Sequence, residues 1–190
     1  MAARQRWRAQ AAHLDGSRLV FLDETALRTN LTRRYGRSRR GTRLVAKVPH
    51  GHWKTTTLIA ALRAQHLTAP TVLDGPVDGP CFVAYVEQVL APTLHPGDCV
   101  VMDNLACHKV AGVQHAIEAV GARLLYLPPY SPDFNPIEQV FAKLKARLRA
   151  TPPRTVARLW GAVGPALSAF SPAECANYFR HAGYRLATPP

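Results

Sequence analysis

Three acidic residues stand at positions where carboxylates could do chemistry. Asp23 ends the apolar run RLVFLD, Asp103 ends the run CVVMD, and Glu138 follows RLLYLPPYSPDFNPIE into the first turn of a predicted helix. Carboxylates from three separate elements can converge on one hard divalent cation, as phosphoryl-transfer enzymes require. We therefore expect Asp23, Asp103 and Glu138 to be catalytic and metal-binding.

These acids also have ordinary structural explanations. Asp23 could be a solvated strand end or a helix cap. In Asn135-Pro136-Ile137-Glu138, asparagine is a favoured N-cap, proline a favoured first helical residue, and glutamate the reciprocal half of a capping box. Capping does not explain why prolines stiffen the preceding loop or why two other acids follow apolar runs. Spacing alone leaves both interpretations open.

The elements that must position these acids alternate between strands and helices. Apolar, Val-, Ile- and Thr-rich runs predict strands over 18–23, 44–48, 55–62, 68–75, 99–104 and 123–127. Periodicity and capping signals predict helices over 79–94, 110–120, 135–149, 153–170 and 171–183, after a short helix or linker over 1–16. This order predicts a mixed α/β domain whose parallel strands are linked by crossover helices. Ligands of such sheets bind beyond the carboxyl ends of the strands, where Asp23 and Asp103 are expected.

The charge of the chain points to a polyanionic partner. Its 190 residues are 47% hydrophobic, as in a folded domain, and 24 basic residues against 12 acidic ones give a net charge of +12. Such a field attracts nucleic acid. An anionic membrane is a weaker alternative, since no run approaches the roughly 18 apolar residues of a spanning helix. The N-terminus also lacks the apolar segment of a secretory signal.

Most of this charge lies in the window 25–73, which holds ten basic residues and no acidic residue. Runs such as RRYGRSRRGTR mix arginine with small polar residues and a tyrosine, which can contact phosphates or stack on a base. A solvated basic loop between two strands is the simpler interpretation, and it is compatible with DNA contact. The residues expected to bind DNA are Arg28, Arg33, Arg34, Arg37, Arg39, Arg40, Arg43, Lys54, Lys143 and Lys145.

Other motifs are weaker. The four cysteines are scattered without a C-x-x-C pair, which favours reduced thiols in a cytoplasmic protein. A zinc site built from Cys107, His108 and the pair His50 and His52 matches no structural zinc spacing. Lys54-Thr55 lacks the glycines of a phosphate-binding loop, so that interpretation is rejected.

Taken together, FLDET, VVMDN-x-x-x-HK and YLPPYSPDFNPIE-x-x-F-x-x-LK resemble the catalytic domain of DDE transposases, in particular the bacterial insertion-sequence branch of the mariner superfamily. The 34 residues between Asp103 and Glu138 are similar to the spacing of the last two acids in that superfamily. The resemblance covers roughly residues 18–150. It implies a ribonuclease H-like mixed sheet flanked by helices, with extra C-terminal helices.

The resemblance also implies a chemistry. Asp23, Asp103 and Glu138 would hold two Mg²⁺ ions, with Mn²⁺ able to substitute, for Mg-dependent cleavage and strand transfer of DNA. Asn104 and His108 would support the metal ligands or contact DNA, although Asn104 could simply cap the turn after its strand. The implied partners are double-stranded DNA, as element ends and as a target with a TA dinucleotide, and a second copy of the chain. The implied location is the bacterial cytoplasm, at the nucleoid.

The expected organisation is an N-terminal linker or remnant over 1–17, the catalytic domain over 18–150 and a helical extension over 151–190 packed on the same domain. Family members carry helix-turn-helix modules before the catalytic domain, so we expect such a module, or a full-length transposase, to be a further partner. The alternative function is a catalytically silent truncated transposase that binds DNA or full-length transposase and regulates transposition. A ribonuclease H or junction nuclease fits the three acids but not YSPDFNPIE.

Overall fold

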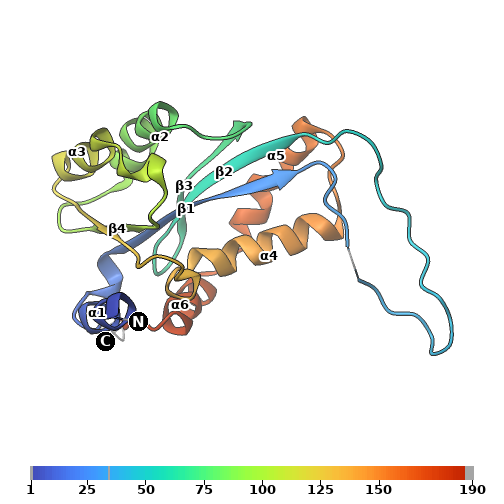
Figure 1. Cartoon of the computed structure of the whole chain (residues 1–190), viewed down its shortest axis with the longest axis horizontal. Helices are drawn as coiled ribbons and strands as arrows, with labels where there is room; N and C mark the ends of the chain where they lie inside the picture. The colour runs from blue at the N-terminus through green and yellow to red at the C-terminus, as the bar shows by residue number, and fades with distance from the viewer. Residues whose placement is uncertain (1, 34, 187–190) are drawn as a thin grey trace.

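A mixed five-stranded sheet forms the centre of the computed structural model, which describes residues 2–33 and 35–186 (Figure 1). The strand order is β3-β2-β1-β4-β5, in which β1, β2 and β3 run antiparallel and β4 and β5 are parallel to β1. The strands are β1 (Leu19–Arg28), β2 (Thr55–Leu62), β3 (Leu67–Asp74), β4 (Cys99–Met102) and β5 (Arg123–Tyr126). The predicted mixed α/β class is confirmed.

Helices cover both faces of the sheet (Figure 1). They are α1 (Ala2–Ala11), α2 (Gly79–Tyr85), α3 (Ala111–Ala119), α4 (Ile137–Ala150), α5 (Val156–Ser168) and α6 (Pro172–His181). The helix predicted over 79–94 is formed by α2 and two short helical segments that continue it, Val86–Leu90 and Ala91–Thr93. None of the described helices combines the length and the apolar character needed to cross a bilayer.

Alternation along β1 divides the core in two, because successive side chains of a strand point to opposite faces. Leu19 and Phe21 belong to the apolar cluster that includes α1, α4, α5 and α6. Val20 and Leu22 belong to the cluster on the other face, with α2 and α3. The face of the sheet to which a β1 side chain points therefore decides which helices it packs against.

The first strand is longer than its apolar run predicts. β1 continues five residues beyond Asp23 to Arg28 and stays paired with β2 over that length, with Asp23 opposite Ala60. The prediction that Asp23 ends a strand is therefore wrong. The continuation is amphipathic, since Thr25 and Leu27 are buried while Ala26 and Arg28 are exposed, and this alternation is itself a strand signal.

The strand predicted over 44–48 is also wrong. The described residues between β1 and β2 contain no strand, and they form a long loop that extends away from the body of the domain (Figure 1). Val45 and Val48 are 83% and 65% exposed. A strand needs a partner and a packed face more than it needs β-branched residues, and this segment has neither.

Candidate active site

The register of β1 and β4 brings two of the predicted acids to the same place. The strands pair in parallel, with Leu19 opposite Cys99 and Phe21 opposite Val101. Two residues beyond this pair lie Asp23, which is still on β1, and Asp103, which directly follows β4, so alternation places both on the face of Phe21 and Val101. That face packs against α4. Asp103 follows the end of β4 as predicted, and Asp23 lies where the pairing of β1 with β4 has ended.

The third acid reaches the same place from α4. Glu138 lies in the first turn of this helix and is exposed. A pocket of about 410 Å³ is lined by all three acids, together with the turn after β4 and the proline-rich loop after β5. The residues of this pocket are Asp23, Asp103, Asn104, Leu105, Leu127, Pro128, Pro129, Tyr130, Ser131, Pro132, Asn135 and Glu138. The structure thus brings the three predicted catalytic residues together.

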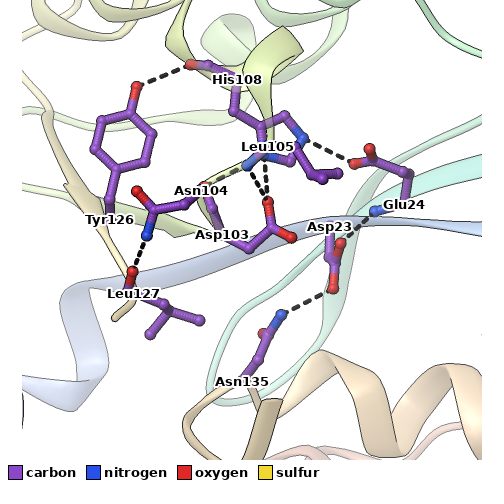
Figure 2. A network of polar contacts seen from close by, with 9 residues as sticks. All are labelled: Asp23, Glu24, Asp103, Asn104, Leu105, His108, Tyr126, Leu127 and Asn135. Carbon is purple, nitrogen blue, oxygen red and sulfur yellow. Dashed lines mark hydrogen bonds and ion pairs between the residues drawn. The ribbon is translucent and has the colours of Figure 1, made fainter. Parts of the chain in front are cut away.

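Asn135 does not cap the helix, which is a correction to its predicted role. α4 begins at Ile137, with Pro136 before it and no side-chain cap. The Asn135 amide instead donates a hydrogen bond to Asp23 Oδ2 at 2.8 Å (Figure 2). Its Oδ1 atom is buried and has no hydrogen-bond partner. No hydrogen bond of the Glu138 carboxylate is present among the described residues, so the capping-box interpretation of Glu138 has no support from this geometry.

The loop before α4 is held by both ends of the described chain. Tyr184 donates its hydroxyl hydrogen to the carbonyl oxygen of Phe134 at 2.7 Å and accepts a hydrogen bond from Trp7 Nε1 at 3.2 Å. Arg4 of α1 pairs with Asp133 at 2.6 Å. These contacts fix the segment that delivers Asn135 and Glu138, and fixed supports are what a precise site requires.

The environment of Asp23 disfavours its negative charge. The side chain is buried, and the nearby charges of Glu138, Glu24 and Asp103 repel it. Burial first, and the charge of Glu138 next, raise the pKa of Asp23 to about 8. Crowded carboxylates of this kind are the donor set that a divalent cation stabilises. The three acids therefore fit a hard metal ion.

The environment of Asp103 is the opposite. His108 Nδ1 lies 2.8 Å from Asp103 Oδ1, and the backbone N–H of Leu105 donates to the same oxygen at 3.0 Å (Figure 2). Burial raises the pKa of Asp103, but these hydrogen bonds outweigh it, and the pKa lies below its usual range. Oδ1 of Asp103 is thus fixed by His108 and by the Leu105 N–H, while the carboxylate lines the pocket.

His108 is completely buried and is held by two acids at once. Its Nε2 atom lies 2.9 Å from Glu24 Oε2, and its ring packs on Phe82 with the ring centroids 4.5 Å apart. Burial opposes its charge, but the hydrogen bonds to Asp103 and Glu24 prevail and raise the pKa of His108 to about 10. Both ring nitrogens therefore carry hydrogen at neutral pH. Sequence reasoning gave Glu24 no role, although alternation places it on the opposite face from Asp23.

Asn104 and Tyr126 complete the support behind the acids. The Asn104 side-chain amide donates to the carbonyl oxygen of Leu127, so it ties the turn after β4 to the end of β5. The Tyr126 hydroxyl donates to the carbonyl oxygen of His108 at 2.8 Å (Figure 2). Asn104 lines the pocket, but its amide contacts backbone.

The zinc site proposed from the histidine pair is not assembled. His50 and His52 line a separate pocket with Trp53 and Arg154, away from Cys107 and His108. Cys107, His108 and Glu24 do have ligand atoms within 4.8 Å of one another. Both nitrogens of His108 are already hydrogen-bonded, however, and burial raises the pKa of the Cys107 thiol, which disfavours the thiolate that zinc needs.

Nine of the ten predicted DNA-binding residues are among the described residues, and these nine fall into three groups. Six lie exposed on the loop between β1 and β2 and are not brought to the acids: Arg33, Arg37, Arg39, Arg40, Arg43 and Lys54. Arg34 lies outside the described residues. Arg28 and Lys145 line one pocket beside α4. Lys143 forms an ion pair with Glu174 that joins α4 to α6.

Three acids thus converge beside the end of β4 and the start of α4, an arrangement that could hold a divalent metal ion. The profile of the DDE superfamily endonucleases matches residues 18–159. The chain therefore belongs to the DDE superfamily endonucleases. No protein in the curated set matches the chain.

Solved structures show the same fold at low sequence identity. The chain is similar to "Mos1 transposase paired-end complex with left transposon end" with a TM-score of 0.75 at 15% identity, covering 94% of this chain and 56% of that one. It is similar to the "catalytic domain of Mos1 mariner transposase" with a TM-score of 0.65 at 14% identity, covering 95% and 83%. It is also similar to "the mariner Mos1 paired end complex with Mg" with a TM-score of 0.75 at 16% identity. The chain thus spans 56% of the Mos1 chains in these paired-end complexes.

Proposed function

We propose that this chain is the catalytic core of a DDE transposase, which cuts DNA strands and joins the cut ends to a target. The observation that carries the proposal is the pocket in which Asp23, Asp103 and Glu138 converge from β1, the end of β4 and α4. Membership of the DDE superfamily endonucleases supports DNA as the substrate. The solved Mos1 complexes on transposon ends support cleavage and joining as the reaction.

Divalent metal is the proposed cofactor. Asp23, Asp103 and Glu138 would hold two Mg²⁺ ions, or Mn²⁺ in their place, and the Mos1 paired-end complexes with Mg and with Mn support this choice. Bound metal of this kind activates an attacking hydroxyl group and stabilises the leaving oxygen. Mg²⁺ suits the site because it takes few carboxylates and keeps positions for water and phosphate oxygens.

The protein's own contribution is to hold these carboxylates in place. Asn135 fixes one oxygen of Asp23, and His108, oriented by Glu24, fixes one oxygen of Asp103. Both oxygens of Asp23 accept a hydrogen bond, Oδ1 from the backbone N–H of Glu24 and Oδ2 from Asn135, while only Oδ1 of Asp103 is held. Glu138 is exposed and has no partner among the described residues, so it is free to approach the metal when DNA is bound. Supports of this kind normally tune metal affinity and activity by orienting the ligands.

DNA is the proposed partner, in a complex with two copies of the chain. The net charge of +12 supplies attraction to the phosphate backbone. The exposed basic residues of the loop between β1 and β2 are proposed to contribute sequence-independent phosphate contacts. The Mos1 paired-end and strand-transfer complexes support this assignment.

Supercoiled-plasmid nicking, combined with DNA binding, tests the proposal. Wild-type protein is expected to nick the plasmid with Mg²⁺ or Mn²⁺, while Asp103→Asn binds the same DNA and does not nick it. With a pre-cut 3′-hydroxyl end, the wild type is expected to join that end to the plasmid. Binding without nicking by the wild type would contradict the proposal and favour a silent regulatory protein.

A further inference from the structure

The guanidinium group of Arg4, on α1, contacts three residues of the loop that precedes α4. It donates hydrogen bonds to both carboxylate oxygens of Asp133, at 2.8 and 2.6 Å, and to the Ser131 hydroxyl at 2.9 Å. Its Cζ atom also lies 4.5 Å from the centroid of the Phe134 ring. One side chain can make all of these contacts because the guanidinium group is planar and carries its N–H groups in a fixed fork. Arg4 therefore holds the loop at three points.

This loop forms part of the pocket that the three acids line, which we call the acid pocket. Ser131 is buried and lines the acid pocket. Its hydroxyl accepts the hydrogen bond from Arg4 and donates one to the carbonyl oxygen of Pro129 at 3.1 Å. Arg4 itself does not line the acid pocket. Any effect of Arg4 on the acids must therefore pass through the loop.

A short chain of turns joins Asp133 to the acid of α4. Glu138 follows Asp133 by five residues, and Asn135 lies between them. The backbone N–H groups of Asn135 and Glu138 donate to carbonyl oxygens three residues earlier, at 3.0 and 3.3 Å. The Asn135 side chain continues this connection to Asp23. A displacement of Asp133 would therefore reach two of the three acids.

A second contact on the same loop is of a different kind. The Tyr184 hydroxyl donates to the carbonyl oxygen of Phe134, and both side chains are buried. The Arg4 and Asp133 side chains are 34% and 53% exposed. An ion pair with this exposure contributes little to stability, because solvent screens it. Loss of Arg4 should therefore disturb the position of the loop more than the stability of the fold.

The helical repeat of α1 directs Arg4 toward the loop. Trp7 and Arg8 follow Arg4 by three and four residues, so the three side chains share one side of the helix. Trp7 is buried and anchors this side of α1 in the core. Arg8 adds a weaker contact to the loop, with its Cζ atom 5.5 Å from the centroid of the Phe134 ring. The docking of α1 through Trp7 thus brings Arg4 to the loop.

We propose that Arg4 is a positioning residue for the DNA cleavage proposed above, because it holds the loop in the place from which Asn135 and Glu138 reach the acid pocket. This inference rests on the proposed function and deepens it. It gives α1 a part in the reaction, although no residue of α1 lines the acid pocket.

Plasmid nicking by Arg4→Gln and Arg6→Gln, measured over a range of DNA concentrations, tests the proposal. Arg6 is an exposed arginine on the same helix and forms no ion pair or cation–π contact among residues 2–33 and 35–186. Both variants lose one positive charge, so a weaker attraction to DNA should raise KM equally in both. Arg4→Gln is expected to lower kcat by about 10-fold or more, because the reacting groups are misplaced. Arg6→Gln is expected to keep the wild-type kcat, and equal kcat values for the two variants would overturn the proposal.

Further variants separate positioning from a general effect on the fold. Arg4→Lys keeps the charge but cannot form the paired hydrogen bonds, so its kcat should lie between those of the wild type and Arg4→Gln. The double variant of Arg4→Gln with Asp133→Asn should lose much less activity than the product of the two single losses, because the two side chains act as one pair. The thermal midpoint of Arg4→Gln should stay within about 3 °C of the wild type. Independent losses that multiply in the double variant would overturn the proposal.

Amide hydrogen exchange without metal shows whether Arg4 holds the loop, independently of cleavage. The backbone N–H groups of Phe134, Asn135 and Glu138 are hydrogen-bonded, so their exchange reports the local order of 134–138. In Arg4→Gln, exchange over 134–138 should be about 10-fold faster, with β4 unchanged. Faster exchange in α1 alone would show that Arg4 holds only its own helix, and would overturn the proposal. If the loop responds as expected but the wild type never nicks DNA, the proposed function alone fails.

Discussion

His108 joins Asp103 to Glu24, with Nδ1 2.8 Å from one carboxylate and Nε2 2.9 Å from the other, inside a fully buried environment. Glu24 and Asp23 are neighbours on β1 and point to opposite faces of the sheet. β1 therefore supplies the proposed metal ligand Asp23 on one face of the sheet. On the other face it supplies Glu24, which holds His108, and His108 in turn holds the second proposed ligand, Asp103. The site therefore depends on residues from both faces of the sheet.

Removing the imidazole of His108 should weaken catalysis more than it disturbs the folding of the pocket. We expect His108→Ala to lower the nicking rate about 10- to 100-fold and to raise the Mg²⁺ concentration needed, because Asp103 loses the group that orients it. Glu24→Gln keeps the shape of its side chain and should show a smaller shift in the same direction. The measurement is the nicking rate against Mg²⁺ concentration, with His115→Ala, an exposed histidine on α3, as the control. Nicking by His108→Ala that equals the control would refute this role.

Nicking should require Asn135 because its amide donates a hydrogen bond to Asp23, and not because it caps α4. Asn135→Asp keeps the size of the side chain but places a carboxylate against Asp23, so we expect loss of nicking and about 1–3 kcal/mol lower stability without metal. Asn177→Asp, at an exposed amide on α6, is the control and should stay within about 0.5 kcal/mol of the wild type. Denaturant unfolding and nicking report the two effects. Unchanged nicking by Asn135→Asp would show that the bond to Asp23 is dispensable.

Without metal, the crowded acids should cost stability. Asp23→Asn removes a carboxyl group whose ionisation is disfavoured by burial and by the charge of Glu138, so its thermal midpoint without metal at neutral pH should exceed that of the wild type. Mg²⁺ at about 100 times its Kd should stabilise the wild type by about 2.7 kcal/mol and the variant far less. Calorimetry with and without Mg²⁺ measures both, with Asp74→Asn as an exposed control. A wild-type midpoint that Mg²⁺ does not move would contradict metal binding.

Asp98 should make the fold sensitive to acid. This buried carboxylate lies 2.7 Å from Arg63 and accepts a hydrogen bond from the His95 backbone N–H at 2.8 Å. Burial raises the pKa of Asp98, but Arg63 and the His95 N–H outweigh it, so the pKa lies below its ordinary value of about 3.9. The stabilisation is therefore present above about pH 4 and is lost as the pH falls through the lowered pKa of the folded state.

Asp98→Asn should destabilise the protein by about 3–5 kcal/mol at neutral pH, because Arg63 is left buried without its partner. The difference from the wild type should shrink as the pH falls below about 4. Thermal unfolding followed by circular dichroism between neutral and acid pH measures this. A difference that stays constant with pH would show that the ion pair contributes nothing to acid sensitivity.

Sequence patterns predicted the parts of the site that depend on local order. The apolar run before Asp103 ends where β4 ends, and the start of α4 falls within two residues of its predicted position. The predicted convergence of Asp23, Asp103 and Glu138 agrees with the pocket they line. Their catalytic and metal-binding roles remain a proposal.

Sequence patterns failed where distant contacts decide the outcome. Asn135 does not cap α4: its amide donates to a buried carboxylate 112 residues away, and its Oδ1, the atom that would accept the capping hydrogen bond, has no partner among the described residues. His108 and Glu24 are 84 residues apart, and only the register of the sheet brings them together. The segment 44–48 has strand-forming residues but nothing to pair with. The alternation from Thr25 to Arg28 was a local signal that could have extended β1 and assigned Glu24 to the other face from Asp23.

Metal-dependent nicking of supercoiled plasmid by the wild type, Glu138→Gln and Glu87→Gln tests the central claim most directly. Both glutamates are exposed, and both substitutions remove one negative charge, but only Glu138 lines the pocket with Asp23 and Asp103. We predict that Glu87→Gln nicks at the wild-type rate and that Glu138→Gln does not nick with Mg²⁺ or Mn²⁺. Equal nicking by Glu138→Gln and Glu87→Gln would mean that the three acids are not the catalytic centre.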